Sequence, residues 1–248
     1  MTLNVKLDGE KYSNDFRRDG YFVCEDVLGQ NEIQQLKIEL GGISGTEVRR
    51  KRSVYGIRNL LEISPAVCEL AADDRIRQFA TSVLGDNAFA VRGIFFDKVA
   101  DANWSLFWHQ DNVIAVQDKV ETEGFVAWSQ KSGVWQVQPP VEVLSKVVTV
   151  RLHLDDCDET NGPLRVLPGS HRHGWLDDEL DDWKEQVSEV VCSVRSGGVV
   201  TMCPLTLHAS SASENAKHRR VIHLEYAAEE LPGSLEWNNR IGPHQVLA

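Results

Sequence analysis

The chain has 248 residues, and its 26 lysines and arginines against 37 aspartates and glutamates give a formal net charge of −11 at pH 7. Apolar residues make up 42% and charged residues 25% of the chain, a balance that excludes disordered and fibrous proteins. The acidic surplus argues against nucleic-acid binding, which needs clustered lysine and arginine on a basic domain.

The N-terminal segment carries Lys6, Asp8 and Glu10, where a signal peptide would need an uninterrupted apolar stretch. No run of the chain approaches the roughly 18 apolar residues of a membrane span. The five cysteines are an odd number at wide spacings without a C-x-x-C pair, which argues against a disulfide framework and a cysteine zinc site. We therefore expect a cytoplasmic protein that acts without a membrane.

Helical patterns occupy the first third of the chain. Residues 31–41 carry apolar side chains at helical spacing, and Gly41 and Gly42 at their end favour a helix stop. Ser64 followed by Pro65 is typical of a helix start, and the residues after Asp73 form another amphipathic segment. These segments predict a helical support over residues 1–86.

A basic run, residues 49–52, lies within this first third. An isolated run of charges is usually a solvated loop, and this is the simpler interpretation. The alternative is that the run lies near the mouth of a site and binds an anion.

From about residue 87 the sequence changes to short β-rich runs, separated by turn-forming residues such as Asn161-Gly-Pro. The runs cover residues 88–96, 133–137, 146–154, 198–203 and 219–226. Helices followed by serial short strands predict a mainly β protein with N-terminal helices, folded as an antiparallel barrel or jelly roll. We expect one domain over residues 1–248, with the jelly-roll core at 87–230 and a C-terminal tail at 231–248.

Two of the eight histidines begin an H-x-D triplet, His109-Gln-Asp111 and His153-Leu-Asp155. On a strand, residues i and i+2 project to the same side, so an imidazole and a carboxylate at this spacing can hold one metal ion. With eight histidines in an aspartate-rich chain, about one such triplet is expected by chance. Neither triplet alone therefore identifies a metal site.

A group of two histidines and one carboxylate leaves coordination positions open for oxygen and a chelating co-substrate. It needs a second histidine from a distant strand, and His208 is suitably placed. It follows Pro204, which would end the strand predicted at 198–203. A structural histidine is the competing interpretation.

Arg219 lies eleven residues after His208, at the start of the last predicted strand. A guanidinium group is permanently charged and its forked donors match a carboxylate, so an arginine that points into a barrel implies a bound acid. Strand alternation places Arg219 and Arg220 on opposite faces, with Arg220 beside the apolar Ile222. The alternative is that Arg219 is a surface residue.

Together these residues resemble the phytanoyl-CoA dioxygenase family of Fe(II)- and 2-oxoglutarate-dependent oxygenases. The resemblance extends over nearly the whole chain and rests on His109-x-Asp111, on Asn161-Gly-Pro-Leu-Arg-Val-Leu-Pro-Gly-Ser-His171, on His208-Ala-Ser-Ser with Arg219, and on the opening segment 16–23. It implies a double-stranded β-helix, cupin-like in its jelly-roll topology. It also implies Fe(II) and 2-oxoglutarate, with conversion of 2-oxoglutarate and O₂ into succinate and CO₂ while a C–H bond of a small organic molecule is hydroxylated.

The resemblance assigns roles to five residues. His109, Asp111 and His208 match the family's iron ligands. Arg219 matches the arginine that binds the distal carboxylate of 2-oxoglutarate, and Ser210 matches a position that touches the same co-substrate.

Two further conclusions follow from the resemblance. The second triplet, His153 to Asp155, falls on the strand that leads into the N-G-P-L turn, where a structural or supporting role is expected. Asp111 stands where iron halogenases of this superfamily have a small residue, so it favours hydroxylation.

Polar Thr149, Arg151 and His153 alternate with apolar residues in the strand predicted at 146–154. Arg151 falls where family members can place an aromatic co-substrate contact, and the sequence departs from the family there. We predict that Arg151 lies in the site and contacts a carboxylate of 2-oxoglutarate or of the substrate. A solvent-exposed polar face is the alternative.

Several aromatic residues lie between residues 104 and 135, and they suggest an aromatic wall over a mostly apolar substrate, with core packing as the alternative. The candidate substrate contacts are Phe96, Trp108, Trp128 and His153.

Two other functions remain open. A cupin-like metalloenzyme would use the same ligands without 2-oxoglutarate, and a non-catalytic barrel would only bind a ligand. The pairing of Arg219 with Ser210 argues against the first alternative, and the intact His109, Asp111 and His208 group argues against the second. The expected partners are a small-molecule substrate and O₂, without nucleic acid or membrane; the sequence indicates neither the substrate nor the oligomeric state.

Overall fold

The computed structural model describes residues 8–51, 53–176, 180–214 and 217–243. Its largest sheet has seven strands in the order β1-β12-β9-β14-β4-β3-β2. These strands are β1 (Tyr21–Cys24), β12 (Val199–Met202), β9 (Val148–His153), β14 (Arg220–Ala227), β4 (Phe89–Asp97), β3 (Val54–Ile57) and β2 (Val48–Arg50).

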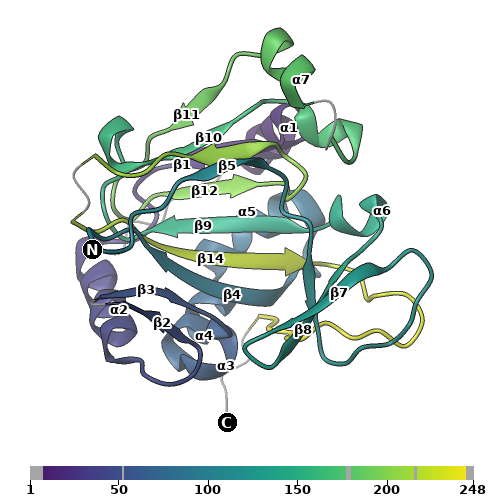
Figure 1. Cartoon of the computed structure of the whole chain (residues 1–248), viewed down its shortest axis with the longest axis horizontal. Helices are drawn as coiled ribbons and strands as arrows, with labels where there is room; N and C mark the ends of the chain where they lie inside the picture. The colour runs from purple at the N-terminus through teal and green to yellow at the C-terminus, as the bar shows by residue number, and fades with distance from the viewer. Residues whose placement is uncertain (1–7, 52, 177–179, 215–216, 244–248) are drawn as a thin grey trace.

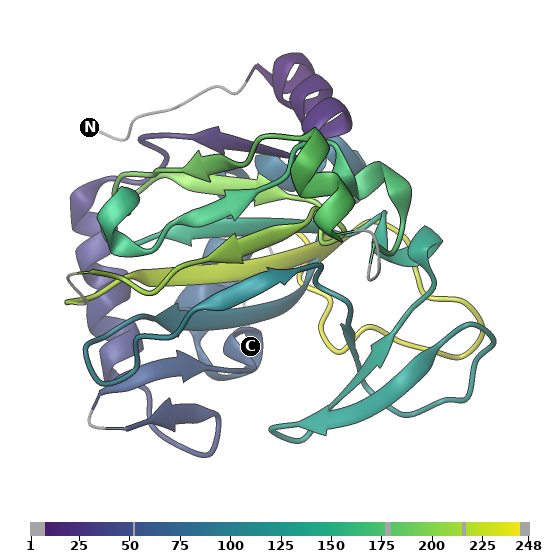
Figure 2. The same ribbon diagram turned by 45° about the horizontal axis from the view of Figure 1, so that its top comes forward.

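A four-stranded sheet faces the large sheet, and the two form the jelly roll that the sequence predicts (Figures 1 and 2). Its order is β11 (Val190–Cys192), β10 (Leu164–Val166), β13 (His208–Ser210) and β5 (Leu106–His109). A third sheet consists of β6 (Ile114–Val116), β8 (Val134–Gln138) and β7 (Val126–Lys131). In Figure 1 the hairpin of β7 and β8 extends beside the barrel.

The N-terminal helices cover the outer face of the large sheet, behind it in Figure 1. They are α1 (Gly9–Asp19), α2 (Gln30–Gly42), α3 (Leu60–Ile63), α4 (Pro65–Ala72) and α5 (Asp74–Leu84). Helical turns elsewhere are α6 (Val141–Leu144), η1 (Glu159–Asn161), η2 (Ser170–His173) and α7 (Leu180–Gln186). In the described part of the chain, no helix combines the length and the apolar character needed to cross a membrane.

The predicted helix starts are confirmed by their hydrogen bonds. The hydroxyl of Ser64 accepts from the backbone N–H of Val67 at 3.3 Å, and the carboxylate of Asp73 accepts from that of Arg75 at 2.8 Å. Each bond satisfies an amide that has no partner within its own helix. The two helices therefore begin where the sequence predicts.

The alternation in β9 organises the core. Val148, Val150 and Leu152 are fully buried in the cluster that joins the sheet to the helices. Strand geometry then directs Thr149 and Arg151 to the opposite face, which lies inside the barrel. The polar face is therefore internal, and the alternative of a solvent-exposed face is wrong.

The first 86 residues also supply β1, β2 and β3 to the large sheet, which the expectation of a helical support did not include. These strands have three or four residues, and β1 pairs with β12 from a distant part of the chain. Such strands exist because of long-range pairing, so they leave little periodicity in the sequence. The predicted tail is packed in its described part, where Trp237 is buried and Ile241 pairs with Ala90; residues 244–248 lie outside the described residues.

Candidate metal and co-substrate site

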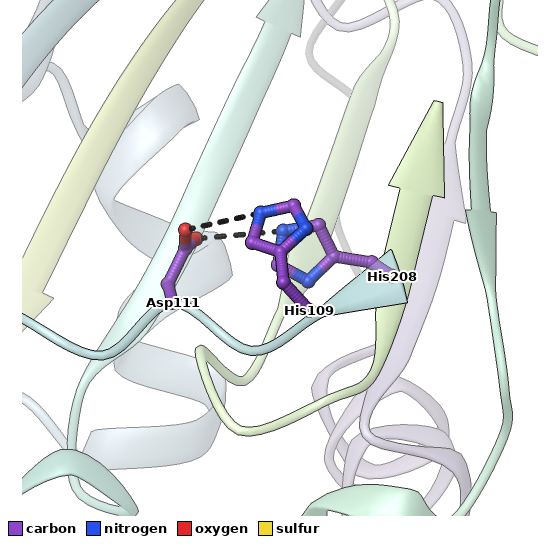
Figure 3. A group of neighbouring side chains, drawn as sticks. All are labelled: His109, Asp111 and His208. Carbon is purple, nitrogen blue, oxygen red and sulfur yellow. Dashed lines mark ion pairs between the residues drawn. The ribbon is translucent and has the colours of Figure 1, made fainter. Parts of the chain in front are cut away.

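His109, Asp111 and His208 come together at one point of the four-stranded sheet. Figure 3 shows the carboxylate of Asp111 facing both imidazole rings. Its oxygens lie 3.9 Å from Nε2 of His109 and 3.7 Å from Nε2 of His208. One possible ligand atom from each residue lies within 4.8 Å of the others. The spacing suits a single metal ion held by two nitrogens and one oxygen.

Hydrogen bonds orient both imidazoles for this purpose. Nδ1 of His109 lies 2.7 Å from the carbonyl oxygen of Phe107, and Nδ1 of His208 lies 2.8 Å from that of Thr206. Since a carbonyl only accepts, each Nδ1 carries the proton and each Nε2 keeps a lone pair directed at the shared point. Burial lowers the pKa of His208 to about 4, against the effect of Asp111, so this ring is neutral at pH 7.

The carboxylate of Asp111 is held ready as an anionic ligand. Burial opposes its ionisation, but the neighbouring His208, His223 and His109 outweigh that effect and lower the pKa of Asp111 to about 2. Its backbone N–H donates to the carbonyl of Pro204 at 3.0 Å. The loop after β5 is thereby tied to the loop before β13, which fixes the carboxylate relative to both histidines.

The three residues open into a cavity of about 600 Å³ that is lined from both sheets of the jelly roll. Arg151 and Arg219 line it from the large sheet, while Ser210 lines it from the four-stranded sheet. Phe96, a predicted substrate contact, also lines this cavity, and its ring lies 5.9 Å from that of His223. The structure thus brings these predicted residues together with the metal-ligand candidates.

Arg219 is a buried cation that forms no ion pair with a carboxylate within the described residues. Its side chain is only 2% exposed, and neither Nε nor Nη1 has a hydrogen-bond partner in the described part of the chain. Burial lowers the pKa of Arg219 to about 10, so the group stays charged at neutral pH. A buried unpaired charge is costly, which favours an acidic ligand at this position. The opposite face of the strand carries Arg220, which pairs with Asp155 at 2.8 Å.

Lys98 is a second buried cation beside Arg219, and the sequence analysis did not identify it. It is fully buried, and its Nζ donates to the hydroxyl of Ser210 at 3.0 Å and to the carbonyl oxygen of Ser211. Burial, together with the charge of Arg219, lowers the pKa of Lys98 to about 7. Within the described residues no carboxylate forms an ion pair with either side chain. The end of the cavity around Ser210 therefore suits an anionic group such as a carboxylate.

A chain of polar contacts connects the centre of the cavity to its side. Nη1 of Arg151 lies 2.9 Å from Nδ1 of His223, whose Nε2 lies 3.2 Å from a carboxylate oxygen of Glu225. The same oxygen accepts from Arg92 at 3.0 Å. Nε of Arg151 has no partner in the described residues, and burial lowers the pKa of Arg151 despite the nearby Asp111. Arg151 thus keeps a buried donor for a ligand.

The N-G-P-L and P-G-S-H elements of the sequence motif brace strand β13. Gly162 has φ +60°, and a Cβ at this position would lie 2.5 Å from the carbonyl oxygen of Ser211. The hydroxyl of Ser170 accepts from the backbone N–H of Leu207 at 2.8 Å. These contacts lie on either side of residues 208–210, which explains how a turn distant in sequence can position them.

Three predicted substrate contacts lie away from the cavity lining. His153 is fully buried beside Arg151 and Arg219, and burial followed by these two charges lowers its pKa well below the usual value. Trp108 packs on the outer side of its strand, beneath the guanidinium of Arg165 at 5.4 Å. Trp128 packs against Trp135 in the hairpin of β7 and β8, at a centroid distance of 6.4 Å.

The reasons for these placements are local. His153 and Asp155 are not arranged to bind one metal ion. Asp155 faces outward, where it pairs with Lys37 at 2.8 Å and with Arg220. Trp108 precedes His109, so strand alternation turns it away from the side that His109 faces. Trp128 belongs to the hairpin of β7 and β8, where its ring packs against Trp135, the edge of the main core and the ammonium group of Lys119 at 5.9 Å.

The described part of the basic run, Arg49 to Lys51, contributes two residues to the cavity lining, Arg49 and Lys51; Arg52 lies outside the described residues. All three described residues are exposed, as the interpretation of a solvated run predicts, although Arg49 and Arg50 lie on β2 and not in a loop. Sequence reasoning also missed Arg58 and His223 as lining residues. For His223, the strand alternation that places it on the same face as Arg219 was a usable signal.

Comparison with known proteins agrees with this geometry. Residues 16–221 match the family model described as phytanoyl-CoA dioxygenase (PhyH). An ectoine dioxygenase of Sphingopyxis alaskensis is 30% identical over 168 residues, which cover 63% of this chain and 48% of that protein. The chain spans about half the length of the ectoine dioxygenases it matches.

Two further similarities cover more of both chains. The L-proline trans-4-hydroxylase of Streptomyces griseoviridis is 24% identical, over 85% of this chain and 83% of that protein. The crystal structure of EctD from S. alaskensis with 2-oxoglutarate and 5-hydroxyectoine superposes with a TM-score of 0.70 at 20% identity, over 92% of this chain and 78% of that one. The structural likeness supports the double-stranded β-helix fold.

Proposed function

The chain belongs to the phytanoyl-CoA dioxygenase family, and on this premise we propose that it is a non-haem Fe(II)- and 2-oxoglutarate-dependent dioxygenase that hydroxylates a C–H bond of a small organic molecule. The observation that carries the proposal is one cavity with two features. A group of two histidines and one carboxylate lies on one wall, and a buried arginine, whose Nε and Nη1 have no hydrogen-bond partner in the described part of the chain, lies on the other. Two relatives are named for the small molecules ectoine and L-proline.

The donor set fits the cofactors. His109 and His208 would hold Fe(II) through Nε2, and Asp111 would hold it through a carboxylate oxygen. When bound, Fe(II) and 2-oxoglutarate would activate O₂, which is the oxidant: the keto acid would give two electrons as it becomes succinate and CO₂, and the substrate C–H bond would give the other two. The protein contributes position and the exclusion of water.

The other end of the cavity would hold the co-substrate. Arg219 offers two unpaired N–H groups to the distal carboxylate of 2-oxoglutarate, and the hydroxyl of Ser210 lies beside it in the cavity lining. A cupin-like enzyme that does not use 2-oxoglutarate would not need a buried, unpaired arginine at this position. A non-catalytic barrel would not need His109, Asp111 and His208 to be arranged around one point.

The experiment is an anaerobic titration of the protein with Fe(II) and 2-oxoglutarate, followed by visible spectroscopy. We expect the weak charge-transfer band of the Fe(II) chelate, and succinate formation once air is admitted. Asp111→Ala and Arg219→Ala should remove or weaken the band, whereas Arg220→Ala, which changes the neighbouring outward-facing arginine, should retain it. A wild-type protein without the band, or variants with an unchanged band, would contradict the assignment.

A further inference from the structure

The cavity lining is strongly cationic in a protein that is acidic as a whole. Among the described residues that line it, six are lysine or arginine and one, Asp111, is a carboxylate. The whole chain nevertheless has a net charge of −11. Two of the cations, Arg151 and Arg219, are buried. The other four, called the outer cation group below, are Arg49, Lys51, Arg58 and Lys131.

Separate segments bring the outer cation group together. Arg49 lies on β2, Arg58 follows β3 directly, and Lys131 ends β7 at the turn of its hairpin. In Figures 1 and 2 this hairpin reaches toward β2 and β3. The amide of Asn59 donates to the carbonyl oxygen of Ser132 at 3.0 Å, which ties the hairpin turn to the end of β3. Burial, followed by Arg58, Arg92 and Arg49, lowers the pKa of Lys131, so these charges act on one another.

Arg49, Lys51 and Lys131 are exposed and Arg58 is half-buried, and no carboxylate in the described part of the chain forms an ion pair with any of the four. Nε of Arg58 is buried without a hydrogen-bond partner among the described residues. Burial, with Arg49 and Arg92, lowers the pKa of Arg58 to about 10, so it is still charged at pH 7. By contrast Arg92 is satisfied by Glu225 at 3.0 Å.

The co-substrate does not account for this excess of positive charge. The two carboxylates of 2-oxoglutarate would be used by Arg219 and by the metal ion. The positive charges of the outer cation group would then still repel one another at the cavity opening. The low-dielectric walls of the cavity strengthen the attraction of these charges for an incoming anion. A ligand with its own acidic group resolves the imbalance.

We propose that the outer cation group is the anion-binding part of the substrate site, and that the substrate carries a carboxylate or phosphate group which these residues hold. The remainder of the substrate extends toward His109, Asp111 and His208. The proposal deepens the proposed function and rests on it for the reaction, but the binding of the anion can be tested without the reaction.

The first test uses the metal-free protein and inorganic pyrophosphate, with binding measured by calorimetry at low salt. We expect binding that Arg58→Gln and Arg49→Gln each weaken at least tenfold. Arg50→Gln is the matched control, because Arg50 is exposed like its neighbour Arg49 but does not line the cavity. Arg219→Gln separates the two ends of the cavity and should retain binding.

The proposal is overturned if wild-type protein does not bind pyrophosphate, or if Arg58→Gln and Arg49→Gln bind it as the wild type does. It is also overturned if Arg219→Gln alone abolishes binding, because the probe then occupies the co-substrate pocket. Salt should weaken the interaction, since these charges are partly exposed to solvent. Thermal unfolding of each variant verifies that it is folded.

The second test uses the Fe(II)-loaded enzyme and measures substrate-stimulated succinate formation. Candidates are compared as matched pairs, a carboxylic acid with its amide and a phosphate ester with its alcohol, which distinguishes the two acidic groups. We expect the charged member to stimulate turnover, with a KM that rises at least tenfold in Arg58→Gln. Equal stimulation by the uncharged member would overturn the proposal. Succinate absent from every reaction, beside intact pyrophosphate binding, would contradict the proposed function and leave the anion site standing.

Discussion

The ammonium group of Lys98 donates a hydrogen bond to the hydroxyl of Ser210 over 3.0 Å, in the interior of the barrel. Ser210 lines the cavity, whereas Lys98 lies behind it. The bond orients the hydroxyl and adds a positive charge next to Arg219, at the end of the cavity that would receive the distal carboxylate. Lys98 is thus a candidate positioning residue for 2-oxoglutarate.

Replacement of Lys98 by methionine tests this relationship. Methionine fills similar space without the charge, so we expect the KM for 2-oxoglutarate to rise about tenfold, the effect of one charge-assisted hydrogen bond. Lys146→Met is the control, because Lys146 forms an exposed pair with Glu229. Steady-state kinetics with varied 2-oxoglutarate measure the effect, and an unchanged KM in Lys98→Met would contradict the role.

The pH dependence gives an independent readout of the same residue. Burial, with the charge of Arg219, lowers the pKa of Lys98 to about 7, so the side chain is charged below that pH and neutral above it. The kcat/KM for 2-oxoglutarate, which reports on the free enzyme, should therefore fall as the pH rises through about 7. In Lys98→Met this step should disappear. A purely structural role would leave the step in place.

Gly162→Ala should destabilise the protein and disturb the co-substrate end of the cavity. The residue has φ +60°, and the new Cβ would lie 2.5 Å from the carbonyl oxygen of Ser211 and 3.2 Å from Nζ of Lys98. We expect a loss of about 1–3 kcal/mol in the free energy of unfolding, measured in urea. Gly169→Ala is the matched control, because Gly169 is also left-handed (φ +81°, ψ −11°) but its Cβ would meet only the flexible guanidinium end of Arg172 at 3.1 Å and no backbone atom closer than 3.7 Å. Equal losses in both variants would show that backbone strain alone is responsible.

Much of the fold could be predicted from local pattern. The alternation of Thr149 and Arg151 with buried apolar residues predicts an internal polar face, and Ser64 and Asp73 predict helix starts, because each depends on neighbours in sequence. The short strands β1, β2 and β3 could not be predicted, since their pairing partners, not their own residues, make them strands.

The candidate site divides in the same way. His109, Asp111, His208 and Arg219 are recognisable in the sequence, because their spacing matches the motif of the family. Lys98 is recognisable only in three dimensions, because the lysine and Ser210 are 112 residues apart and meet through the curvature of the barrel. The outer cation group forms only when the hairpin of β7 and β8 packs against the end of β3. The spacing of its residues in the sequence does not predict this packing.

Asp155 should contribute to stability in a pH-dependent manner. Burial opposes its charged form, but hydrogen bonds from Arg220 and Lys37 outweigh this and lower the pKa of Asp155 from 3.8 to about 2. The contribution, about 2 kcal/mol, is therefore fully present above about pH 4 and is lost as the pH falls toward 2. The difference in free energy of unfolding between wild type and Asp155→Asn should be large at pH 7 and shrink at pH 2.5. A constant difference would contradict the linkage.

Arg151 should prove to be a ligand-binding arginine. It is 8% exposed, its Nη1 contacts His223, and its Nε has no partner within the described part of the chain. Because a buried donor without an acceptor is costly, we expect it to bind a carboxylate, and Arg151→Gln should raise a KM at least tenfold. A rise for 2-oxoglutarate identifies the co-substrate as its ligand, and a rise for the substrate identifies the substrate. Arg151→Lys keeps the charge but loses the forked geometry, so partial recovery is expected. Both KM values unchanged in Arg151→Gln would contradict the prediction.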